Sequence, residues 1–385
     1  MHILVLPKWY PGAPDPQLGD FIRKQMLAVA SMHKVSVVHT CAVEGLAEPY
    51  RQDLDTSGGA WELHSYYRHD RIPLSSFRKA INFQRYRKAA MAGIERMLQE
   101  RGKPDLIHAH ILTRPAYAAW LLARKWDIPF VISEQSSTHL KGTWQQKHRA
   151  ARYLDRFLYR QAAGSTAVSP HLAKALEAAG LGRNHAVVPN VIPGMNRPLS
   201  PAGPANHFMM VADLVDGVKN VSGVLNALAL ARSKGHDLKL EVIGGGADEE
   251  MLHAHANALG LKEHVVWHGR LPQAEVQPLM ARMGTVIINS RFETFSVVTG
   301  EALACGKPVI ATRCGGPEAF VTPENGLLIP VDDDQALCEA MIRMAQEHGR
   351  YAPHAIRASV GSRFSPEAVA RGFDQVYQQV LKRGK

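Results

Sequence analysis

Short apolar runs alternate along the chain with longer stretches in which apolar residues recur every three or four positions. The short runs are rich in Val, Ile and Leu and are bounded by polar, Gly or Pro residues, which is typical of strands covered on both faces. In the first half this pattern predicts strands at 3–6, 35–39, 106–109, 130–133 and 165–168, and helices at 21–31, 77–99, 115–126 and 171–179.

The same alternation restarts after residues 189–204, whose five prolines predict a linker. The second half has predicted strands at 207–212, 238–243, 265–268, 285–289 and 308–311, and predicted helices at 220–233, 247–258, 273–281, 297–305 and 334–347. Because repeated β–α units form parallel sheets with right-handed crossovers, we expect two doubly wound α/β domains. Ligands of such sheets bind beyond the carboxyl ends of the strands, so the cleft that the two domains face is the expected site.

Composition narrows the class of protein. The 385 residues suit two or three domains, and 46% apolar with 21% charged residues excludes a disordered, collagen-like or coiled-coil chain. No apolar run is long enough for a transmembrane helix, and the N-terminus lacks the basic region of a signal peptide. The four cysteines (Cys41, Cys305, Cys314, Cys338) have no metal-ligand or disulfide spacing, which favours a reducing cytoplasm.

Two glutamates flank a predicted strand-to-helix turn in the second half. Glu293 lies in the loop after the strand at 285–289, and Glu301 lies about one turn into the helix at 297–305. Free N–H groups at the start of that helix would favour a phosphate, and the two carboxylates could accept hydrogen bonds from sugar hydroxyls. The simpler interpretation makes Glu293 a partner of the helix dipole and Glu301 a surface residue, and spacing alone does not decide.

The residues around the two glutamates resemble a known signature. Glu293 and Glu301 have seven residues between them and are followed by Ala-Leu-Ala-Cys-Gly-Lys-Pro-Val-Ile-Ala and then by Gly-Gly-Pro-Glu at 315–318. This segment resembles the donor site of retaining nucleotide-sugar glycosyltransferases with the GT-B fold (family 4). The resemblance implies that Glu293 binds donor hexose hydroxyls, that Glu301 holds the ribose hydroxyls, and that the N–H groups after Phe295 hold the diphosphate (Ser296, Val297, Val298).

Other segments of the second half resemble the same family, with one departure. Lys219 stands where the family has a lysine on the diphosphate, and a flexible point charge suits a phosphate. Asp213 stands where the family has an arginine, and an acid there would repel the diphosphate, so either Asp213 turns away or another cation substitutes. The glycine turn at 244–246 is by itself a weak signal. The resemblance implies that Gly244 of this turn belongs to the donor site. It also implies that the segment at 268–271 faces the nucleobase, which adds Arg270 and Leu271 to the donor site.

A long connection follows the first strand. The 13 residues from Pro7 to Gly19 exceed an ordinary β–α loop, and long ordered loops at strand ends are often functional. Trp9 and Tyr10 in this connection are acceptor-side candidates. Gly19 opens the next helix, where a backbone can approach a ligand closely. The resemblance places Gly19 beside the donor phosphate and sugar, whereas the simpler interpretation is a helix-start glycine.

Two histidines end the strand at 106–109. Alternation places His108 and His110 on one face, but no third ligand has suitable spacing, so we expect no metal. In the family the second histidine of this segment reaches the reacting sugar. The resemblance therefore gives that role to His110 and leaves His108 as a packing residue.

Three further polar positions have competing interpretations. Glu134 and His139 lie in the loop after the strand at 130–133 and could bind acceptor hydroxyls, although a solvated loop explains them equally well. Ser169 is expected to cap the helix at 171–179, because it has no nucleophile context. The acids at 332–334 are likewise expected to cap a helix.

The resemblance implies a function and an architecture. It implies retaining transfer of a hexosyl unit from a UDP- or GDP-sugar to a hydroxyl of a glycan or lipid-linked glycan, in cell-surface polysaccharide or glycolipid synthesis. We expect no metal or other cofactor, and we expect His110, Glu293 and Lys219 to take part in catalysis, since stabilising the diphosphate leaving group is the main demand. The implied GT-B domains are 1–188 and 206–363, with a linker at 189–205 and a helix in 364–385 that crosses back to the first domain.

Other classes of protein remain as alternatives. A GT-B epimerase or phosphorylase would share the architecture. A nicotinamide dehydrogenase would need a dinucleotide fingerprint after the first strand, where the sequence reads Pro-Lys-Trp-Tyr-Pro. A basic nucleic-acid-binding protein would explain the net charge of +10, but no aromatic RNA-binding signature is present, so we expect no nucleic-acid partner.

Most of the positive charge lies in one segment. Residues 68–103 contain ten Lys or Arg and three Asp or Glu, a net +7 of the whole-chain +10. Tyr and Phe side chains share this segment, and a basic amphipathic helix suits an anionic membrane surface or a lipid-linked acceptor. The alternative is a solvated crossover helix. We therefore expect a cytoplasmic protein that binds peripherally to the inner face of the cytoplasmic membrane.

Overall fold

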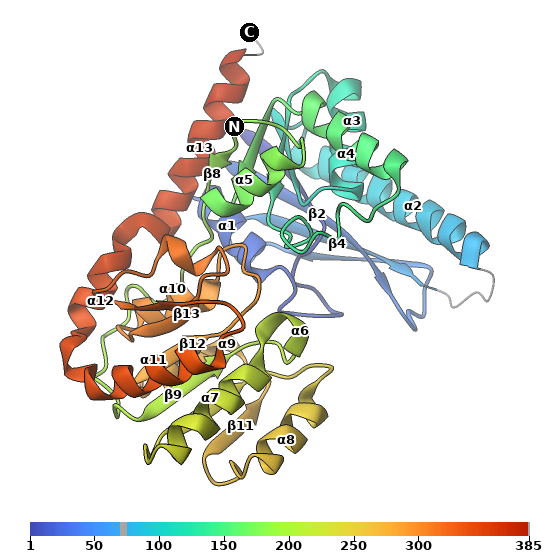
Figure 1. The fold of residues 1–385 in the computed structure, drawn as a ribbon. Coiled ribbons are helices and arrows are strands. Elements are labelled where there is room, and N and C mark those ends of the chain that lie inside the picture. Colours follow the sequence, from blue (N-terminus) through green and yellow to red (C-terminus); the bar gives the residue numbers. More distant parts are fainter. Residues whose placement is uncertain (70–74, 384–385) are drawn as a thin grey trace. The chain divides into compact units, whose positions relative to one another are not determined.

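A computed structural model of the chain describes residues 1–69 and 75–383. Contacts divide the chain into two units. The first contains Met1–Val191 and the C-terminal helix, and the second contains Ile192–Ser365 (Figure 1). The predicted boundaries near 188, 206 and 364 differ from these limits by up to about 14 residues at the linker, because residues from Ile192 onward pack with the second unit. Lys307, for example, donates to the Pro201 carbonyl.

The first unit is built around an eight-stranded sheet with the order β3-β4-β2-β1-β5-β6-β7-β8. The bounds of its strands are β1 (His2–Pro7), β2 (Lys34–Val43), β3 (Tyr50–Asp55), β4 (Trp61–Arg68), β5 (Leu106–His110), β6 (Phe130–Glu134), β7 (Gly164–Ala167) and β8 (Ala186–Val187). Those of its helices are α1 (Asp20–Ala30), α2 (Ser75–Arg101), α3 (Arg114–Trp126), α4 (Arg149–Gln161), α5 (Pro170–Ala178) and α13 (Pro366–Arg383). All neighbouring strands are parallel except β3 and β4.

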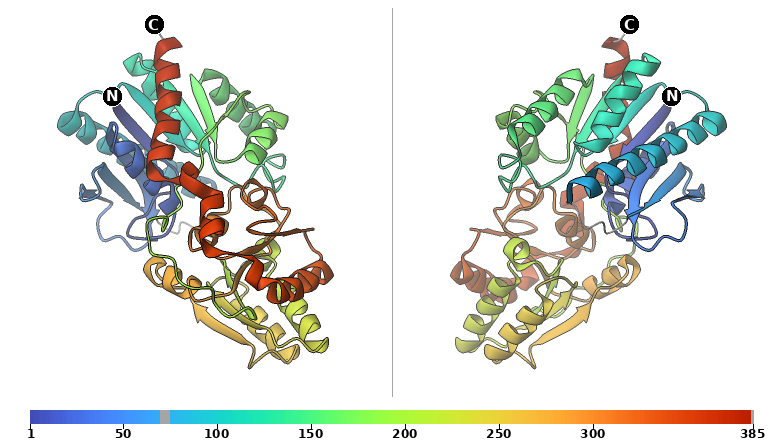
Figure 2. Two further views of the ribbon diagram at one scale, coloured as in Figure 1. Left: turned by 90° about the vertical axis from the view of Figure 1, so that its left-hand side faces the viewer. Right: turned by 90° about the vertical axis from the view of Figure 1, so that its right-hand side faces the viewer.

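Helix α13 completes the core of the first unit, as Figure 2 shows from two further sides. Its buried side chains Val369, Phe373 and Tyr377 join a cluster with β1, α1 and β2. The chain therefore returns to the first unit after Ser365, and the predicted crossover helix is confirmed. None of the helices in the described part of the chain is both long and apolar enough to span a membrane.

The second unit is a six-stranded parallel sheet with the order β11-β10-β9-β12-β13-β14. Its strands are β9 (His207–Val211), β10 (Lys239–Ile243), β11 (Val265–Gly269), β12 (Thr285–Ile288), β13 (Val309–Thr312) and β14 (Gly326–Ile329). Its helices are α6 (Asp216–Lys219), α7 (Val221–Ser233), α8 (Glu249–Ala258), α9 (Gln273–Met280), α10 (Val297–Ala304), α11 (Asp334–Gln346) and α12 (Pro353–Val360). The predicted α/β class with two doubly wound domains is confirmed.

One edge of the sheet in the first unit departs from the parallel pattern. The hairpin β3–β4 pairs antiparallel, and neither strand was predicted, because Tyr-Arg-Gln-Asp-Leu-Asp lacks the apolar run of a buried strand. As an edge strand, β3 keeps polar side chains toward water. Helices α4, α6 and α12 and strands β8 and β14 were also not predicted. The expected helix caps are confirmed, since Ser169 Oγ accepts from Leu172 N–H and Asp333 Oδ1 from Ala336 N–H.

Candidate active site

The second unit brings Lys219 and Glu293 together at the carboxyl ends of its strands. Lys219 is the last residue of α6, Glu293 follows β12, and Lys219 Nζ lies 2.6 Å from Glu293 Oε1. Ser290 Oγ donates to the same oxygen over 2.8 Å. Burial disfavours the ammonium, but the adjacent carboxylate raises the pKa of Lys219 above its ordinary value. Lys219 therefore stays charged at neutral pH, which suits an anionic ligand.

The loop that carries Glu293 is held by the segment after β13. The Glu293 N–H donates to the Cys314 carbonyl over 3.2 Å, and the Gly316 N–H donates to the Glu293 carbonyl over 3.0 Å. A Cβ on Gly316 would lie 2.7 Å from the Phe295 carbonyl carbon, so only glycine allows this approach. Phe295 itself is buried and packs on Phe320 with ring centroids 4.8 Å apart. Its side chain is a structural anchor, and only its backbone leads into the site.

The start of α10 offers uncapped N–H groups. Ser296, the residue before the helix, has φ 68° and makes no side-chain capping bond. Its hydroxyl instead pairs with the Thr299 hydroxyl over 2.7 Å. A non-glycine residue in the left-handed region is strained, and such strain persists where the surroundings enforce it. The start of α10 at Ser296, Val297 and Val298 thus has no side-chain cap, and its role in holding a diphosphate stays a prediction.

Glu301 lies on α10 and is almost fully buried, at 6% exposure. Gln273, at the first position of α9, donates from Nε2 to Glu301 Oε1 over 2.5 Å. The interpretation of Glu301 as a surface residue was therefore wrong. Gln273 was not anticipated as its partner, because nothing in the sequence spacing links α9 to α10.

The glycine turn after β10 lies close to Asp213, the residue that stands where the family has an arginine. Gly244 has φ 145°, and a Cβ there would lie 1.8 Å from the Ala212 carbonyl oxygen, so the turn requires glycine. Arg270, which follows β11, reaches across to donate from Nη2 to Asp213 Oδ1 and to the Gly245 carbonyl, both over 3.1 Å. Both side chains are more than half exposed. A cation therefore lies beside Asp213, supplied by Arg270, and Leu271 follows it in the loop to α9.

Arg291 organises the same edge of the sheet and was not anticipated. Its guanidinium donates to Asp332 Oδ1 over 2.6 Å, to the Asp216 carbonyl over 2.6 Å and to Asn220 Oδ1 over 2.9 Å. These bonds fix both ends of α6, the helix that ends at Lys219. Its only sequence signal was its place two residues before Glu293.

The connection after β1 is tightly packed around Gly19. Gly19 precedes α1 with φ 76°, and a Cβ there would lie 2.5 Å from the Trp9 carbonyl carbon. Trp9 is partly exposed and carries Lys8 Nζ 5.1 Å from its ring centroid. Tyr10 is fully buried and donates to Glu62 Oε1 over 2.7 Å. The structure thus places Trp9 at the surface of this connection and Tyr10 in the core beneath it.

His110 and His108 end β5 in a fully buried position. His108 bonds to the Tyr377 hydroxyl over 2.7 Å and to Ser133 Oγ over 2.6 Å, as expected of a packing residue. Gln135 Nε2 lies 3.5 Å from His110 Nδ1, while His110 Nε2 has no hydrogen-bond partner among the described residues. Burial lowers the pKa of His110 to about 3, so its ring is neutral at neutral pH.

Glu134 and His139 lie side by side but are buried. Glu134 accepts from the N–H groups of Leu112, Gln135 and Ser136 over 2.8–3.1 Å, and His139 Nε2 lies 3.8 Å from its second oxygen. Burial would raise the pKa of Glu134, but these partners hold it below its ordinary value. The interpretation as a solvated loop was wrong, because the carboxylate ties together the loops after β5 and β6. A role in acceptor binding stays a prediction.

No group of three or more His, Cys, Asp or Glu side chains within 1–69 and 75–383 could hold a metal ion. The four cysteines are all free, and Cys314 and Cys338 are buried.

Comparisons with known proteins show which family the chain resembles. A family model described as a glycosyl transferase 4-like domain matches residues 25–191, and one described as glycosyl transferases group 1 matches residues 197–357. The D-inositol 3-phosphate glycosyltransferase of Xylanimonas cellulosilytica is 26% identical over 325 residues, which cover 77% of each chain.

Two solved structures share the fold over essentially the whole chain. Sucrose-phosphate synthase from Thermosynechococcus elongatus has a TM-score of 0.77 at 18% identity and covers 100% of both chains. HepE of Anabaena, in complex with UDP, has a TM-score of 0.74 at 18% identity and covers 98% of this chain and 100% of its own. The two family models, the relatives and the shared fold together show that this chain belongs to the family 4 glycosyltransferases with the GT-B fold.

Proposed function

We propose that the protein transfers a hexosyl unit from a UDP- or GDP-sugar to an acceptor hydroxyl with retention at the anomeric carbon and without a metal ion. The observation that carries the proposal is the second unit's arrangement of Lys219, Glu293 and the uncapped start of α10. HepE of Anabaena, a structural relative, was solved with UDP. The acceptor we propose is a glycan or lipid-linked glycan of cell-surface polysaccharide or glycolipid synthesis.

The chemistry follows from where charge develops. As the glycosidic bond breaks, negative charge grows on the diphosphate, so donors already aimed at it lower the barrier. The N–H groups of Ser296 to Val298 and the Lys219 ammonium are such donors. They stabilise the diphosphate leaving group, a role that a metal ion has in other enzymes. Glu293 and Glu301 accept from hexose and ribose hydroxyls, respectively. His110 acts as a neutral hydrogen-bonding group, because burial keeps its imidazole uncharged.

Donor binding is tested by thermal unfolding with UDP-glucose, UDP-galactose, GDP-mannose and ADP-glucose in turn. We expect one of them to raise Tm for the parent protein and for Lys262→Ala, an exposed lysine of the same unit, but not for Lys219→Ala. No shift with any of the four would count against a nucleotide-sugar donor. A shift that Lys219→Ala preserves would refute the assignment of the diphosphate site.

Reaction type is tested on the product. We expect release of the nucleoside diphosphate together with a glycosylated acceptor whose anomeric configuration, measured by NMR, equals that of the donor. EDTA is expected to leave the rate unchanged. Inversion would refute retention, loss of activity with EDTA would refute metal independence, and an epimerised free nucleotide sugar would favour the epimerase alternative.

We also propose that α2 binds an anionic membrane surface from the cytoplasm. The support is its charge: Arg87 and Lys88 are exposed on α2, next to the exposed Phe83. Arg71 lies outside the described residues, as do the side chains of Arg78 and Lys79. Co-sedimentation with phosphatidylcholine vesicles, with and without phosphatidylglycerol, is the test. Binding only to the anionic vesicles is expected, and equal or absent binding to both would refute the proposal.

A further inference from the structure

A large apolar groove lies in the first unit between α2, α3 and α4. Its volume is about 1010 Å³, near the upper end of pockets that bind small molecules. Apolar side chains from all three helices line it: Phe83 and Met91 from α2, Tyr117 and Leu121 from α3, and Leu154 from α4. We refer to this hollow as the α2–α4 groove.

Buried side chains such as Ile94 and Leu122 also line the α2–α4 groove, but its large apolar side chains include an exposed set. The five named above are between 36% and 46% exposed, although each is large and apolar. Single exposed apolar residues are common, but a contiguous set in a hollow marks a binding surface. A ligand that covered them would be stabilised by burying apolar surface that remains exposed to water in the folded protein.

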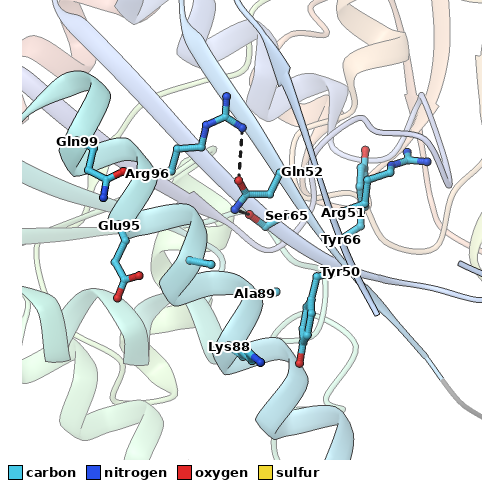
Figure 3. Close-up of a pocket in the computed structure, with 11 residues that line it drawn as sticks. Tyr50, Arg51, Gln52, Ser65, Tyr66, Lys88, Ala89, Glu95, Arg96 and Gln99 are labelled. Carbon is cyan, nitrogen blue, oxygen red and sulfur yellow. Dashed lines mark hydrogen bonds between the residues drawn. The ribbon is translucent and has the colours of Figure 1, made fainter. Parts of the chain in front are cut away.

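A second hollow, on another side of α2, differs in character. Figure 3 shows Arg96 of α2 reaching toward Gln52 of the β3–β4 hairpin, with Lys88 near Tyr50. Its cations already have partners, since Lys88 lies over the Tyr50 ring and Arg96 bonds to Glu100. The unsatisfied surface beside α2 is therefore the apolar one.

Cations stand at the α2–α4 groove with few acids to oppose them. Arg87 and Arg114 line it, and Arg114 lies over the Tyr86 ring at 5.0 Å; within the described residues, neither has a carboxylate partner. Lys147 also lines it but is paired with Asp155 over 3.0 Å. A face that is apolar with an excess of positive charge complements a hydrocarbon chain that ends in an anion.

The end of the groove at which Arg114 lies is near the carboxyl ends of β1 and β5. Arg114 follows His110 by four residues, and the Lys8 N–H donates to the His110 carbonyl over 3.1 Å. Burial lowers the pKa of Lys8, and the nearby charges of Lys147 and Arg114 lower it further, while Glu134 opposes them. Three cations thus gather where the strands of this unit end, the edge at which doubly wound sheets bind ligands.

We propose that the α2–α4 groove binds the hydrocarbon chain of a phosphate-bearing lipid, with the phosphate at Arg114 and Arg87. The inference rests on the proposed lipid-surface role of α2, which it deepens by naming the class of lipid and its site. It needs no assumption about the donor. An amphipathic helix of another protein would need acidic residues to meet the same cations, and a second copy of this basic chain would bring further positive charge instead.

The test measures binding of dodecyl phosphate by isothermal titration calorimetry, below the concentration at which it forms micelles. We expect saturable binding to the parent protein. Dodecyl maltoside, with an equal chain and a neutral head, and inorganic phosphate, with no chain, are each expected to bind at least tenfold more weakly. No binding of dodecyl phosphate, or equal binding of the maltoside, would overturn the proposal.

Matched variants locate the site. Leu154→Glu places a charge in the groove, and Tyr153→Glu places one on the same helix outside it, at a residue that is 64% exposed. Arg114→Gln removes a groove cation, and Arg124→Gln removes an exposed one from the same helix α3. We expect Leu154→Glu and Arg114→Gln to weaken dodecyl phosphate binding at least tenfold and both controls to bind as the parent does. Because the altered side chains are exposed, unchanged Tm values show that the variants fold.

Other results distinguish lipid binding in the α2–α4 groove from binding of α2 to a membrane surface. Anionic vesicle binding that persists while dodecyl phosphate fails to bind would uphold the surface role of α2 and overturn the groove assignment. Self-association abolished by Leu154→Glu, again without dodecyl phosphate binding, would replace the lipid with a second copy.

Discussion

The ion pair between Lys219 and Glu293 permits a quantitative test in the absence of any ligand. The perturbations are Lys219→Met, Glu293→Gln and the two combined, which form a double-mutant cycle. Lys219→Met leaves the Glu293 carboxylate with the Ser290 hydroxyl as its remaining side-chain partner. Glu293→Gln still offers a carbonyl oxygen to Lys219, so we expect it to destabilise the protein less.

The magnitude follows from distance and exposure. At the 2.6 Å separation, the Coulomb energy is about 6 kcal/mol with an effective dielectric constant of 20, before desolvation is subtracted. The side chains are 23% and 15% exposed, so the pair lies between a surface pair and a buried one. We expect about 2 kcal/mol of destabilisation for Lys219→Met, a decrease in Tm of about 4–8 °C for a unit of this size.

The assay is thermal unfolding of all four proteins without ligand, with Arg343→Gln and Glu347→Gln as an exposed control pair at the end of α11. The double variant is expected to be no less stable than Lys219→Met, because it leaves no uncompensated charge. If the losses of stability in the two single variants add up in the double variant, with no more coupling than in the control pair, the ion pair does not stabilise the fold.

Three further outcomes follow from the site. Because burial lowers the pKa of His110 to about 3 and that of His108 well below its ordinary 6.5, both stay neutral in the fold while the unfolded chain protonates near 6.5. Stability should therefore be complete above pH 6.5 and fall as pH decreases, by about 1.4 kcal/mol per pH unit for each histidine, and Tm of His110→Gln should fall less steeply. Tyr377→Phe removes the bond to His108 and should lower the free energy of unfolding, measured in urea, by about 1–3 kcal/mol; an unchanged free energy would contradict this bond. Arg270→Gln should weaken binding of the preferred donor about tenfold by calorimetry while Asp213→Asn does not, and the reverse order would show that Arg270 serves only Asp213.

The sequence predicted what depends on local pattern. Strands β1, β5, β6 and β9 to β13 contain short apolar runs, so they were predicted within one or two residues, including β11 at an edge of its sheet. Strand β3 was missed because a half-exposed edge strand needs no such run. Helix α4 was missed although Ala150, Leu154 and Phe157 recur at helix spacing opposite its arginines, a signal that could have found it. Local pattern records the burial of an element and not the identity of its neighbours.

Contacts between residues that are distant in the sequence could not be predicted, because local pattern does not identify the neighbours of an element. The departure at Asp213 was visible, but Arg270, its partner, is 57 residues away and becomes its neighbour only through the order of β9, β10 and β11. Gln273 and Arg291 likewise acquire their roles from chain crossings that no spacing rule records. The burial of Glu134 was equally hidden, because a polar loop sequence does not show that backbone N–H groups surround its acid.

The return of α13 to the first unit sets an order in time. Val369, Phe373 and Tyr377 fill the first core, yet they leave the ribosome only after the whole second unit has been made. At about 5–20 residues per second, the intervening residues 192–365 take roughly 9–35 s to synthesise. Throughout that interval the apolar face of β1, α1 and β2 that α13 covers stays open, so we expect the nascent first unit to be completed only once α13 has been synthesised.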